Sequence, residues 1–481
     1  MNIRPVQRQT MISLFWQIAF TAIGFLSTMY FAHVVGAAIL GAYFLFTAYQ
    51  SIFSMVSDGG FGGAALKRIS EGEEPDAFFS AYFVLRLLFT GFVIIFLFIF
   101  KPYFVDLNRS GLFFLLIAAL AFSLFDGPIS AGVAGTGKMG IRTTCAGIGN
   151  IAKILFQVIA IFLGYEAGGL VVGAIAGTLV AAIIEFHFFD LHFVKFTWEH
   201  IKSLSVFSFW LFMTSGGVLV FSQADVIMIG YFLNNADVGV YRIALQFTTI
   251  ATFTTYALRT TLWPKVSKWG KSRDTMLVEE SLSQALSYSL LLAIPVMVGG
   301  ILLGDKLLYF FYGEEFKKGY YVLIFLLAVQ VVNVFQFFFT MYLDALDHPK
   351  ESFKVTFVSA VANILLNILF IPVYGITGAA IATFLTMILN VILARRPLMK
   401  LMNIKIKYDT LKNILAASLI MGVFVGIYRT FVPLSNVIIT LFPVLIGGII
   451  FSIVLIKIDG EIYNEIKNIA LKMELPWPSW I

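Results

Sequence analysis

Residues 87–100 read LLFTGFVIIFLFIF, and residues 111–125 read GLFFLLIAALAFSLF. Neither stretch contains a charged side chain, and a helix of about 20 apolar residues is long enough to cross the hydrocarbon core of a bilayer. A membrane-spanning β-strand would instead alternate apolar and polar residues over about 10 positions. The apolar runs here are continuous, so the sequence predicts membrane-spanning helices.

The whole chain has the composition of a protein with many membrane spans. Of its 481 residues, 59% are hydrophobic and only 12% are charged, and the mean hydropathy is +0.91. An ordinary soluble domain is roughly 45–50% apolar and about 25% charged. A soluble fold could not cover so much apolar surface with so few charges. The composition therefore excludes a disordered chain, a disulfide scaffold, a coiled coil and a cytosolic enzyme.

The sequence predicts no cofactor, no metal and no nucleic-acid partner. The single cysteine, Cys145, excludes a disulfide framework, and the five histidines have no ligand-like spacing. Residues 135–140 match G-x-G-x-x-G and residues 132–138 match G-x-x-x-x-G-K. The first pattern needs a preceding strand, and Met139 stands where the second needs Ser or Thr. We interpret both as a tight glycine turn, and we expect no ATP hydrolysis.

Reading the apolar runs between charged residues, glycines and prolines gives fourteen predicted spans. They are residues 11–32, 38–66, 77–100, 111–133, 142–164, 169–191, 207–232, 238–264, 280–303, 320–346, 352–371, 377–400, 411–431 and 436–456. The first run is too long for a cleaved signal peptide and lacks a small-residue cleavage site. The predicted fold class is therefore an all-α integral membrane protein with about 14 transmembrane helices.

The distribution of Lys and Arg tests this map and sets its orientation. With the N-terminus and every second loop taken as one side, 23 of the 33 basic residues lie on that side, six lie on the other and four lie within spans. Cytoplasmic loops of membrane proteins carry an excess of Lys and Arg. We therefore expect both termini in the cytoplasm, in a multi-pass protein of the cell (inner or cytoplasmic) membrane.

The two halves of the chain resemble each other. The matching features lie at offsets of 194 and 198 residues: Phe15-Trp16 with Gly36 against Phe209-Trp210 with Gly230, and Gly41-x-Tyr43 with Lys67 against Gly239-x-Tyr241 with Lys265. Small residues spaced by four recur at Gly169, Gly173 and Gly177 and at Gly378, Ala382 and Thr386. This spacing lets helix backbones approach closely in lipid. The alternative is a chance match between helices rich in glycine and alanine.

The repeat predicts how the chain is divided. Each copy contains six spans, an even number, so both copies have the same orientation, and transporters of this kind bind substrate between the halves. We predict an N-terminal lobe at residues 1–200 with spans 1–6 and a C-terminal lobe at residues 201–405 with spans 7–12. Residues 406–481 would then hold two appended spans and an amphipathic cytoplasmic tail.

Several of these motifs resemble those of a known family. Gly41-Ala-Tyr43, Asp58-Gly-Gly-Phe-Gly-Gly and Ala65-Leu-Lys67-Arg68, with the second-half counterpart from Gly239-Val-Tyr241 to Pro264-Lys265, resemble the Wzx-type polysaccharide flippases. That family belongs to the multidrug/oligosaccharidyl-lipid/polysaccharide exporter (MOP) superfamily, and the resemblance covers essentially the whole chain. It implies alternating-access flipping of undecaprenyl-diphosphate-linked oligosaccharide repeat units from the cytoplasmic to the outer leaflet. It also implies a role in O-antigen, capsule or exopolysaccharide synthesis, with membrane lipids and polysaccharide polymerases as partners.

Two related families fit the sequence less well. Peptidoglycan-precursor flippases carry basic residues along the first helix, and proton-coupled drug antiporters carry an acid there. Residues 11–32 contain neither. An ion-coupled multidrug or cation antiporter remains the first alternative. A membrane glycosyltransferase or polymerase is the second, although it usually needs a large extramembrane loop, and the longest predicted loops here have about fifteen residues.

Four basic residues lie inside predicted spans, and three of them lie away from the inner ends: Arg86 in the third, Lys153 halfway along the fifth and Arg242 near the outer end of the eighth. A charge near the bilayer centre costs about 2.5–3.5 kcal/mol on insertion scales, so each charge needs a role. We predict that the three line a cationic cavity for the substrate diphosphate, because Arg and Lys bind phosphate well. The alternatives are that Arg86 or Arg242 snorkels or pairs with an acid and that Lys153 forms an internal salt bridge.

Two acidic residues near the inner half of the first lobe are candidates for ion coupling or for pairing. Asp58 lies among glycines at the inner end of the second span. Its expected role is structural, either to cap a helix or to pair with Lys67 or Arg68. Asp126 begins the sequence Asp126-Gly-Pro128, which is expected to break the fourth span.

A third acid, Asp225, lies in the seventh span. It could pair with Arg242, or it could carry a coupling proton or cation, and pairing is favoured because intramembrane acids usually find partners. Arg259, Glu185 and Asp344 lie near the inner ends of their spans, and we expect them to snorkel to the membrane surface.

Overall fold

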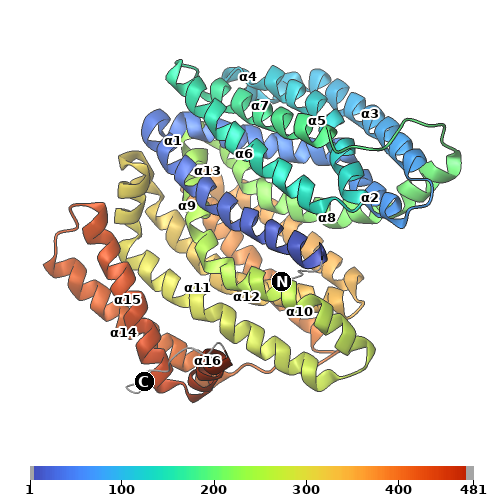
Figure 1. The fold of residues 1–481 in the computed structure, drawn as a ribbon. Coiled ribbons are helices and arrows are strands. Elements are labelled where there is room, and N and C mark those ends of the chain that lie inside the picture. Colours follow the sequence, from blue (N-terminus) through green and yellow to red (C-terminus); the bar gives the residue numbers. More distant parts are fainter. Residues whose placement is uncertain (1–4, 473–481) are drawn as a thin grey trace. The chain divides into compact units, whose positions relative to one another are not determined.

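The structure, a computed structural model, describes residues 5–472, and every regular element in that range is a helix. The helices are α1 (Pro5–Asp58), α2 (Phe61–Glu71), α3 (Pro75–Ile99), η1 (Lys101–Tyr103), α4 (Val105–Arg109), α5 (Phe113–Gly135), α6 (Met139–Phe162), α7 (Ala167–Phe186), α8 (Trp198–Phe232), α9 (Asn235–Thr248), η2 (Thr249–Thr252), α10 (Phe253–Lys271), α11 (Thr275–Tyr312), η3 (Glu314–Gly319), α12 (Tyr320–Ala345), α13 (Pro349–Leu398), α14 (Tyr408–Phe431), α15 (Val437–Ile458) and α16 (Gly460–Lys472). Figure 1 follows the chain through them. They form two compact units, unit 1 (Met1–Gly239) and unit 2 (Val240–Ile481). The predicted all-α class is confirmed.

Ten of the described helices are long and apolar enough to cross a membrane, and two of these carry two predicted spans each. Helix α1 has 54 residues and helix α13 has 50. A non-helical glycine interrupts each helix in the gap between its two predicted spans: Gly36 has φ 73° and ψ 179°, and Gly375 has φ 59° and ψ −143°. Glycine adopts such dihedrals at little cost because it has no Cβ.

The seventh and eighth predicted spans are less regular. Helix α8 is bent by 41° between Trp198–Met213 and Gly216–Phe232. Only the two parts together are long and apolar enough to cross a membrane. Residues 238–264 form α9, η2 and α10 in succession, and this stretch is not among the ten. Here Thr248 and Thr249 donate hydrogen bonds to the carbonyls of Leu245 and Gln246, and side-chain bonds of this kind bend helices. The prediction of one continuous helix over 238–264 is wrong.

The packing of α6 against α7 explains the small-residue stripe of the first half. A Cβ added at Gly173 would lie 2.7 Å from the backbone nitrogen of Gln157, and one at Gly177 would lie 2.6 Å from the carbonyl oxygen of Gly149. Lipid provides no hydrophobic drive between helices, so close backbone packing supplies the association energy. The Gln157 amide donates to the carbonyl of Leu170 at 2.8 Å, which satisfies a buried polar group.

The two copies of the Gly-x-Tyr motif meet inside unit 1. A Cβ at Gly41 would lie 1.7 Å from the carbonyl oxygen of Asn235, and a Cβ at Gly239 would lie 2.3 Å from that of Ala37. The 198-residue offset of the sequence repeat relates Ala37 to Asn235 and Gly41 to Gly239. The two contacts are therefore equivalent positions of the two copies. A two-fold relation between two similar elements produces reciprocal contacts of this kind. The contact therefore supports an internal repeat.

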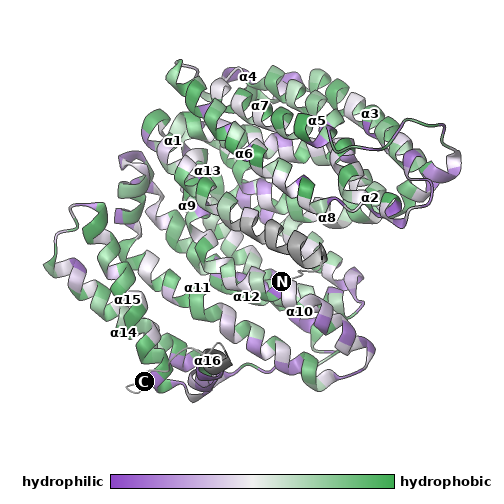
Figure 2. Ribbon diagram, in the orientation of Figure 1, coloured by the Kyte–Doolittle hydropathy of each residue, from purple (hydrophilic) through white to green (hydrophobic). Residues whose placement is uncertain are grey.

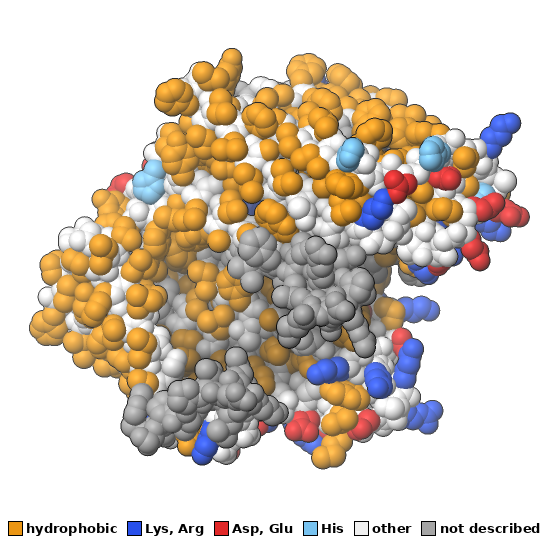
Figure 3. Space-filling model, in the orientation of Figure 1, with side chains coloured by type: hydrophobic (Ala, Val, Ile, Leu, Met, Phe, Trp, Pro, Cys, Tyr) orange, Lys and Arg blue, Asp and Glu red, His pale blue; other side chains and the backbone are white. Residues whose placement is uncertain are grey.

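Helix faces that do not pack against other helices are apolar. On α6 the exposed side chains include Leu155, Ile159 and Phe162, and Phe162 is 91% exposed. Figure 2 shows hydrophobic residues along the length of the helices. Figure 3 shows hydrophobic side chains covering much of the visible surface of unit 1. Lipid chains solvate such surfaces, and helices leave no backbone group unsatisfied in lipid. The chain is a multi-pass membrane protein.

Unit 2 has its own core, which holds the last two spans. Leu286 of α11, Phe338 of α12 and Ala417 of α14 belong to one buried hydrophobic cluster. Arg429 of α14 forms an ion pair with Asp305 of α11 at 3.0 Å. Helices α14 and α15, which have no counterpart in the first half of the sequence, therefore pack on α11.

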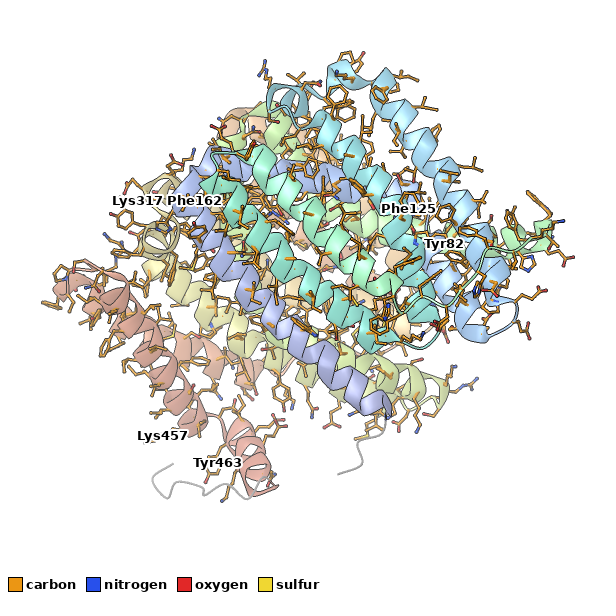
Figure 4. All side chains as sticks on the ribbon, turned by 45° about the horizontal axis from the view of Figure 1, so that its top comes forward. Tyr82, Phe125, Phe162, Lys317, Lys457 and Tyr463 are labelled. Carbon is orange, nitrogen blue, oxygen red and sulfur yellow. The ribbon has the colours of Figure 1, made fainter. Side chains whose placement is uncertain are left out.

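The predicted amphipathic tail forms helix α16, which begins directly after α15. Its Glu461 pairs with Lys407, and Tyr288 of α11 donates a hydrogen bond to Glu465. Figure 4 labels Lys457 and Tyr463 on either side of the junction between α15 and α16. These contacts hold α16 against the core of unit 2.

Candidate functional site: charged residues within the membrane helices

The first intramembrane charge, Arg86 on α3, is neutralised by Asp58. Its Nη1 lies 2.5 Å from the Asp58 carboxylate and donates to the Tyr82 hydroxyl at 2.8 Å. Tyr82 in turn donates to Asp58 at 2.7 Å. Tyr82 and Arg86 lie four residues apart, which places them on one face of α3. The arrangement closes a three-membered polar network between α1 and α3.

Glycines place Asp58 in this network. Asp58 is the last residue of α1, and Gly59 and Gly60 follow it with φ of 59° and 79°, a left-handed turn that leads into α2. The Asp58 carboxylate also accepts a hydrogen bond from the backbone nitrogen of Gly62 at 3.1 Å, in the first turn of α2. Asp58 therefore caps the start of α2, which is one of the two structural roles that the sequence predicts for it.

The other expected role, pairing of Asp58 with Lys67 or Arg68, is wrong, because Asp58 pairs with Arg86. Arg68 pairs with Glu71 at 2.8 Å on the same helix. The Lys67 ammonium lies 4.4 Å from the centre of the Phe207 ring. Neither side chain forms an ion pair with Asp58, whose partner is Arg86.

Helix α5 passes beside the Arg86 guanidinium. A Cβ at Gly127 would lie 2.4 Å from Arg86 Cζ, so only glycine leaves room for the guanidinium there. Phe125 packs near Phe83, which follows Tyr82, with ring centres 6.1 Å apart, and Figure 4 labels Tyr82 and Phe125 on these neighbouring helices. The carboxyl group of Asp126 interacts electrostatically with the positive charge of Arg86.

The expectation that Asp126-Gly-Pro128 breaks its span is wrong. Helix α5 runs without interruption from Phe113 to Gly135 and contains Pro128. Proline removes one backbone donor from a helix, but a membrane helix tolerates it where neighbouring groups satisfy the freed carbonyl. Within this uninterrupted helix, Gly127 lies on the face that meets Arg86 of α3.

Lys153 lies partly buried on α6 against α7. A Cβ at Gly177 would lie 2.5 Å from Lys153 Cβ, so α7 passes directly over the base of this side chain. Among the ion pairs of the described residues none involves Lys153, so the alternative of an internal salt bridge does not hold for residues 5–472. Lys153 is thus a partly buried ammonium with no acidic partner in this part of the chain.

Asp225 and Arg242 belong to different units. Asp225 of α8, in unit 1, is 7% exposed. Arg242 of α9, in unit 2, is partly buried. Their pairing stays a prediction, as does the role of Asp225 in ion coupling.

Of the three residues expected to snorkel, one does not. Glu185 of α7 is 3% exposed. Arg259 is exposed, and its guanidinium lies 5.5 Å from the Trp263 ring centre and 5.0 Å from that of Phe337, which suits a snorkelling side chain. Asp344 is partly buried. Burial of Glu185 is a correction to the sequence analysis.

Sequence reasoning missed a second polar group, in unit 2. Asn367 of α13 donates to Asn363 at 3.1 Å, and Asn363 donates to Thr383 at 3.3 Å. Both asparagines are 1% exposed or less. The signal that could have found them is the four-residue spacing of two amides in an otherwise apolar run. Among residues 5–472 no three His, Cys, Asp or Glu side chains converge as metal ligands.

A family model described as polysaccharide biosynthesis protein matches residues 31–320 of this chain. The chain belongs to the polysaccharide biosynthesis protein family. The predicted resemblance to a polysaccharide biosynthesis family is thereby confirmed. The match includes both copies of the Gly-x-Tyr motif and the Asp58, Arg86, Asp126 and Lys153 positions.

Two curated relatives extend this family assignment over almost the whole chain. The "Probable low-salt glycan biosynthesis flippase Agl15" of Haloferax volcanii is 28% identical over 93% of this chain and 94% of its own. The "Probable flippase AglR" of the same organism is 24% identical over 93% of this chain and 95% of its own.

Solved structures show the fold of this polysaccharide biosynthesis protein. The lipid II flippase MurJ in its inward closed conformation aligns with a TM-score of 0.77 at 19% identity, covering 92% of this chain and 98% of that chain. A MATE-family multidrug resistance transporter of the MOP superfamily, in an inward-facing conformation, aligns with a TM-score of 0.66 at 14% identity, covering 79% and 94%. At these identities the likeness concerns the fold alone.

Proposed function

We propose that this protein flips polyprenyl-diphosphate-linked oligosaccharide repeat units from the cytoplasmic to the outer leaflet, by alternating access and without chemical change to the substrate. The observation that carries the proposal is the similarity, over 93% of the chain, to two proteins named as flippases, one of them for glycan biosynthesis. The family match over residues 31–320 supports the same role. Undecaprenyl is the carrier that the resemblance implies, and O-antigen, capsule or exopolysaccharide synthesis is the pathway.

The geometry supports Lys153 as the main contact for the diphosphate. A diphosphate carries concentrated negative charge, and a basic side chain in a low-dielectric site can replace the water it loses there. Lys153 is partly buried and makes no ion pair within the described residues. We propose Arg242 as a second contact.

Arg86 takes a different part in the proposed site. Its charge is already balanced by Asp58 at 2.5 Å, so it adds little net positive potential. We propose that the pair aligns α1 with α3 and leaves the remaining guanidinium nitrogens for polar groups of the sugar.

The proposal includes an orientation and partners. The excess of Lys and Arg on one side supports cytoplasmic termini in the cell membrane. A flippase delivers its product to enzymes on the outer face, so a polysaccharide polymerase and other assembly proteins are the proposed partners.

Deletion of the gene with leaflet-resolved analysis of lipid-linked oligosaccharide tests the proposal. We expect the oligosaccharide to accumulate on the cytoplasmic leaflet, and wild-type protein to restore its appearance outside. The Lys153→Ala variant, expressed at the same level, should restore it poorly. Unchanged lipid-linked pools together with altered efflux of cationic dyes would overturn the proposal in favour of a drug antiporter.

A further inference from the structure

Glu185 is a buried carboxyl group without a full set of partners. It is 3% exposed, and its Oε1 makes no hydrogen bond within the described residues. It is the second-last residue of α7, so the negative end of the helix dipole lies beside it and disfavours a carboxylate. Nothing in the proposed glycan site explains why an acid occupies this position.

The groups that face Glu185 come from the two helices packed against α7. Helix α5 contributes Asp126, a second acid, and Ser130. Helix α6 contributes Arg142 and Cys145. Helix α1 also packs on α7; its residues 11–29 carry no ionisable side chain, and the side chain of Arg8, nearer its start, lies outside the described residues.

The charges of this cluster do not balance. Asp58 and Arg86 neutralise each other as a close pair, which leaves the two carboxylates of Asp126 and Glu185 against one guanidinium, that of Arg142. Arg142 makes no ion pair with either acid within 4.0 Å in the described part of the chain. Keeping two nearby carboxylates ionised in a low-dielectric site costs electrostatic free energy, so the two groups commonly share one proton. Among the described side chains, this cluster therefore has one positive charge fewer than it has carboxylates.

We propose that Glu185 and Asp126 form a proton-binding site in unit 1, with the proton held on Glu185 Oε1 in the resting protein. A proton from water forms the O–H bond, the carboxylate becomes a neutral carboxylic acid, and its new donor points toward Asp126. Release returns the proton to Asp126 or water and restores one negative charge. The binding of this proton is independent of which glycan is transported, whereas its coupling to transport rests on the proposed function.

A proton fits the site better than a metal ion. The cluster offers two carboxylates and one hydroxyl, with a guanidinium close by, and residues 5–472 contain no group of three metal-ligating acids, histidines or cysteines. A proton needs only one unpartnered carboxylate oxygen, which is what Glu185 Oε1 supplies.

Infrared spectroscopy of the purified full-length protein in lipid tests the site directly. We expect a carboxylic-acid C=O band at pH 7 that shifts on exchange into D₂O, is missing in Glu185→Gln and is retained in Glu71→Gln. Glu71 is the matched control because it is exposed and already paired with Arg68. A wild-type protein without this band, or a band unaffected by Glu185→Gln, would overturn the proposal. Loss of the band on adding Na⁺, but not choline, at constant pH would overturn it in favour of a sodium site.

A second variant keeps the test decisive if Glu185→Gln does not fold. Asp126→Asn removes the like charge, so the band should titrate away at a lower pH than in wild type, and an unchanged titration would contradict the shared site. In proteoliposomes, a pH step should change the flipping rate of wild type at least twofold more than that of Glu185→Gln. If wild type shows the band and flips no lipid-linked oligosaccharide, the proposed function fails while the proton site stands.

Discussion

At the scale of single residues, the two membrane cations of unit 1 differ in what surrounds them. Arg86 has a carboxylate at 2.5 Å and a phenol at 2.8 Å, whereas Lys153 has no ion-pair partner within the described chain. The Arg86 charge is balanced within the protein, whereas the Lys153 charge is the one that we propose for the ligand. Substitution of each should therefore affect a different property of the protein.

Asp58→Asn should destabilise the protein. It leaves the buried Arg86 guanidinium without its counter-charge, and breaking a buried ion pair typically costs about 3 kcal/mol or more. Thermal unfolding of the purified protein in detergent measures the loss. Glu71→Gln, which breaks the exposed pair with Arg68, should cost about 0–1 kcal/mol. Equal losses in the two variants would mean that the Arg86 pair is not buried from water.

Lys153→Ala should impair transport and leave stability nearly unchanged. Losing a charged hydrogen bond to a phosphate removes about 1.5–3 kcal/mol of binding, which corresponds to about a tenfold or larger loss in substrate affinity. Flipping of a fluorescent lipid-linked oligosaccharide in proteoliposomes measures the effect. Lys153→Arg should retain most activity, and Lys354→Ala, at an exposed lysine paired with Glu351, serves as the control. Full activity of Lys153→Ala would remove Lys153 from the proposed site.

At the scale of helices, close packing depends on glycines at particular crossings. Helix α7 presents Gly173 and Gly177 to α6, and α1 presents Gly41 to the start of α9. The neighbouring atoms at these crossings include backbone atoms, which cannot rotate away as the tip of a side chain can. Other glycines on the same helices have open space, which provides matched controls.

Gly177→Ala should destabilise unit 1. The new methyl would lie 2.5 Å from Lys153 Cβ and 2.6 Å from the Gly149 carbonyl oxygen, and overpacking of this kind typically costs about 1–3 kcal/mol. Gly168→Ala, on the same helix with nothing within 4 Å, should be neutral or slightly stabilising. Denaturant or thermal unfolding compares the two. A neutral Gly177→Ala would show that α6 and α7 can separate freely.

Gly41→Ala and Gly239→Ala should have similar effects because their contacts are reciprocal. Each methyl would meet a backbone carbonyl oxygen, at 1.7 Å and 2.3 Å, so each variant should lose about 1–3 kcal/mol of stability. Gly217→Ala in α8, which has open space, should not. Thermal unfolding measures all three, and opposite effects at Gly41 and Gly239 would argue against a two-fold relation between the copies.

At the scale of the whole molecule, the topology rests on the charge bias of the loops. The native Cys145 is buried, so a Cys145→Ala background permits labelling of single introduced cysteines. Lys138→Cys should react with a membrane-impermeant maleimide only after the membrane is opened, and Lys317→Cys should react in intact cells. The reverse pattern would invert the predicted orientation. Reaction of both in intact cells would indicate a missing or additional span.

The positions of most helices, the breaks between spans 11–32 and 38–66 and between spans 352–371 and 377–400, and the internal repeat could be predicted from the sequence. Apolar length, positive-inside charge and glycine spacing are properties of local sequence, and the bilayer imposes them on each helix separately. The break at residues 249–252 was not predicted, because hydropathy does not register threonine hydroxyls that bond to backbone carbonyls.

What only the tertiary structure decided is which charges meet. Asp58 pairs with Arg86, 28 residues away, rather than with the nearer Lys67 or Arg68, and Glu185 is buried beside Asp126 instead of reaching the membrane surface. Sequence spacing gives the depth of a residue along its helix but not the face that neighbouring helices cover. Depth follows from each helix's own interaction with the bilayer, whereas the partner of a buried charge depends on how several helices pack together.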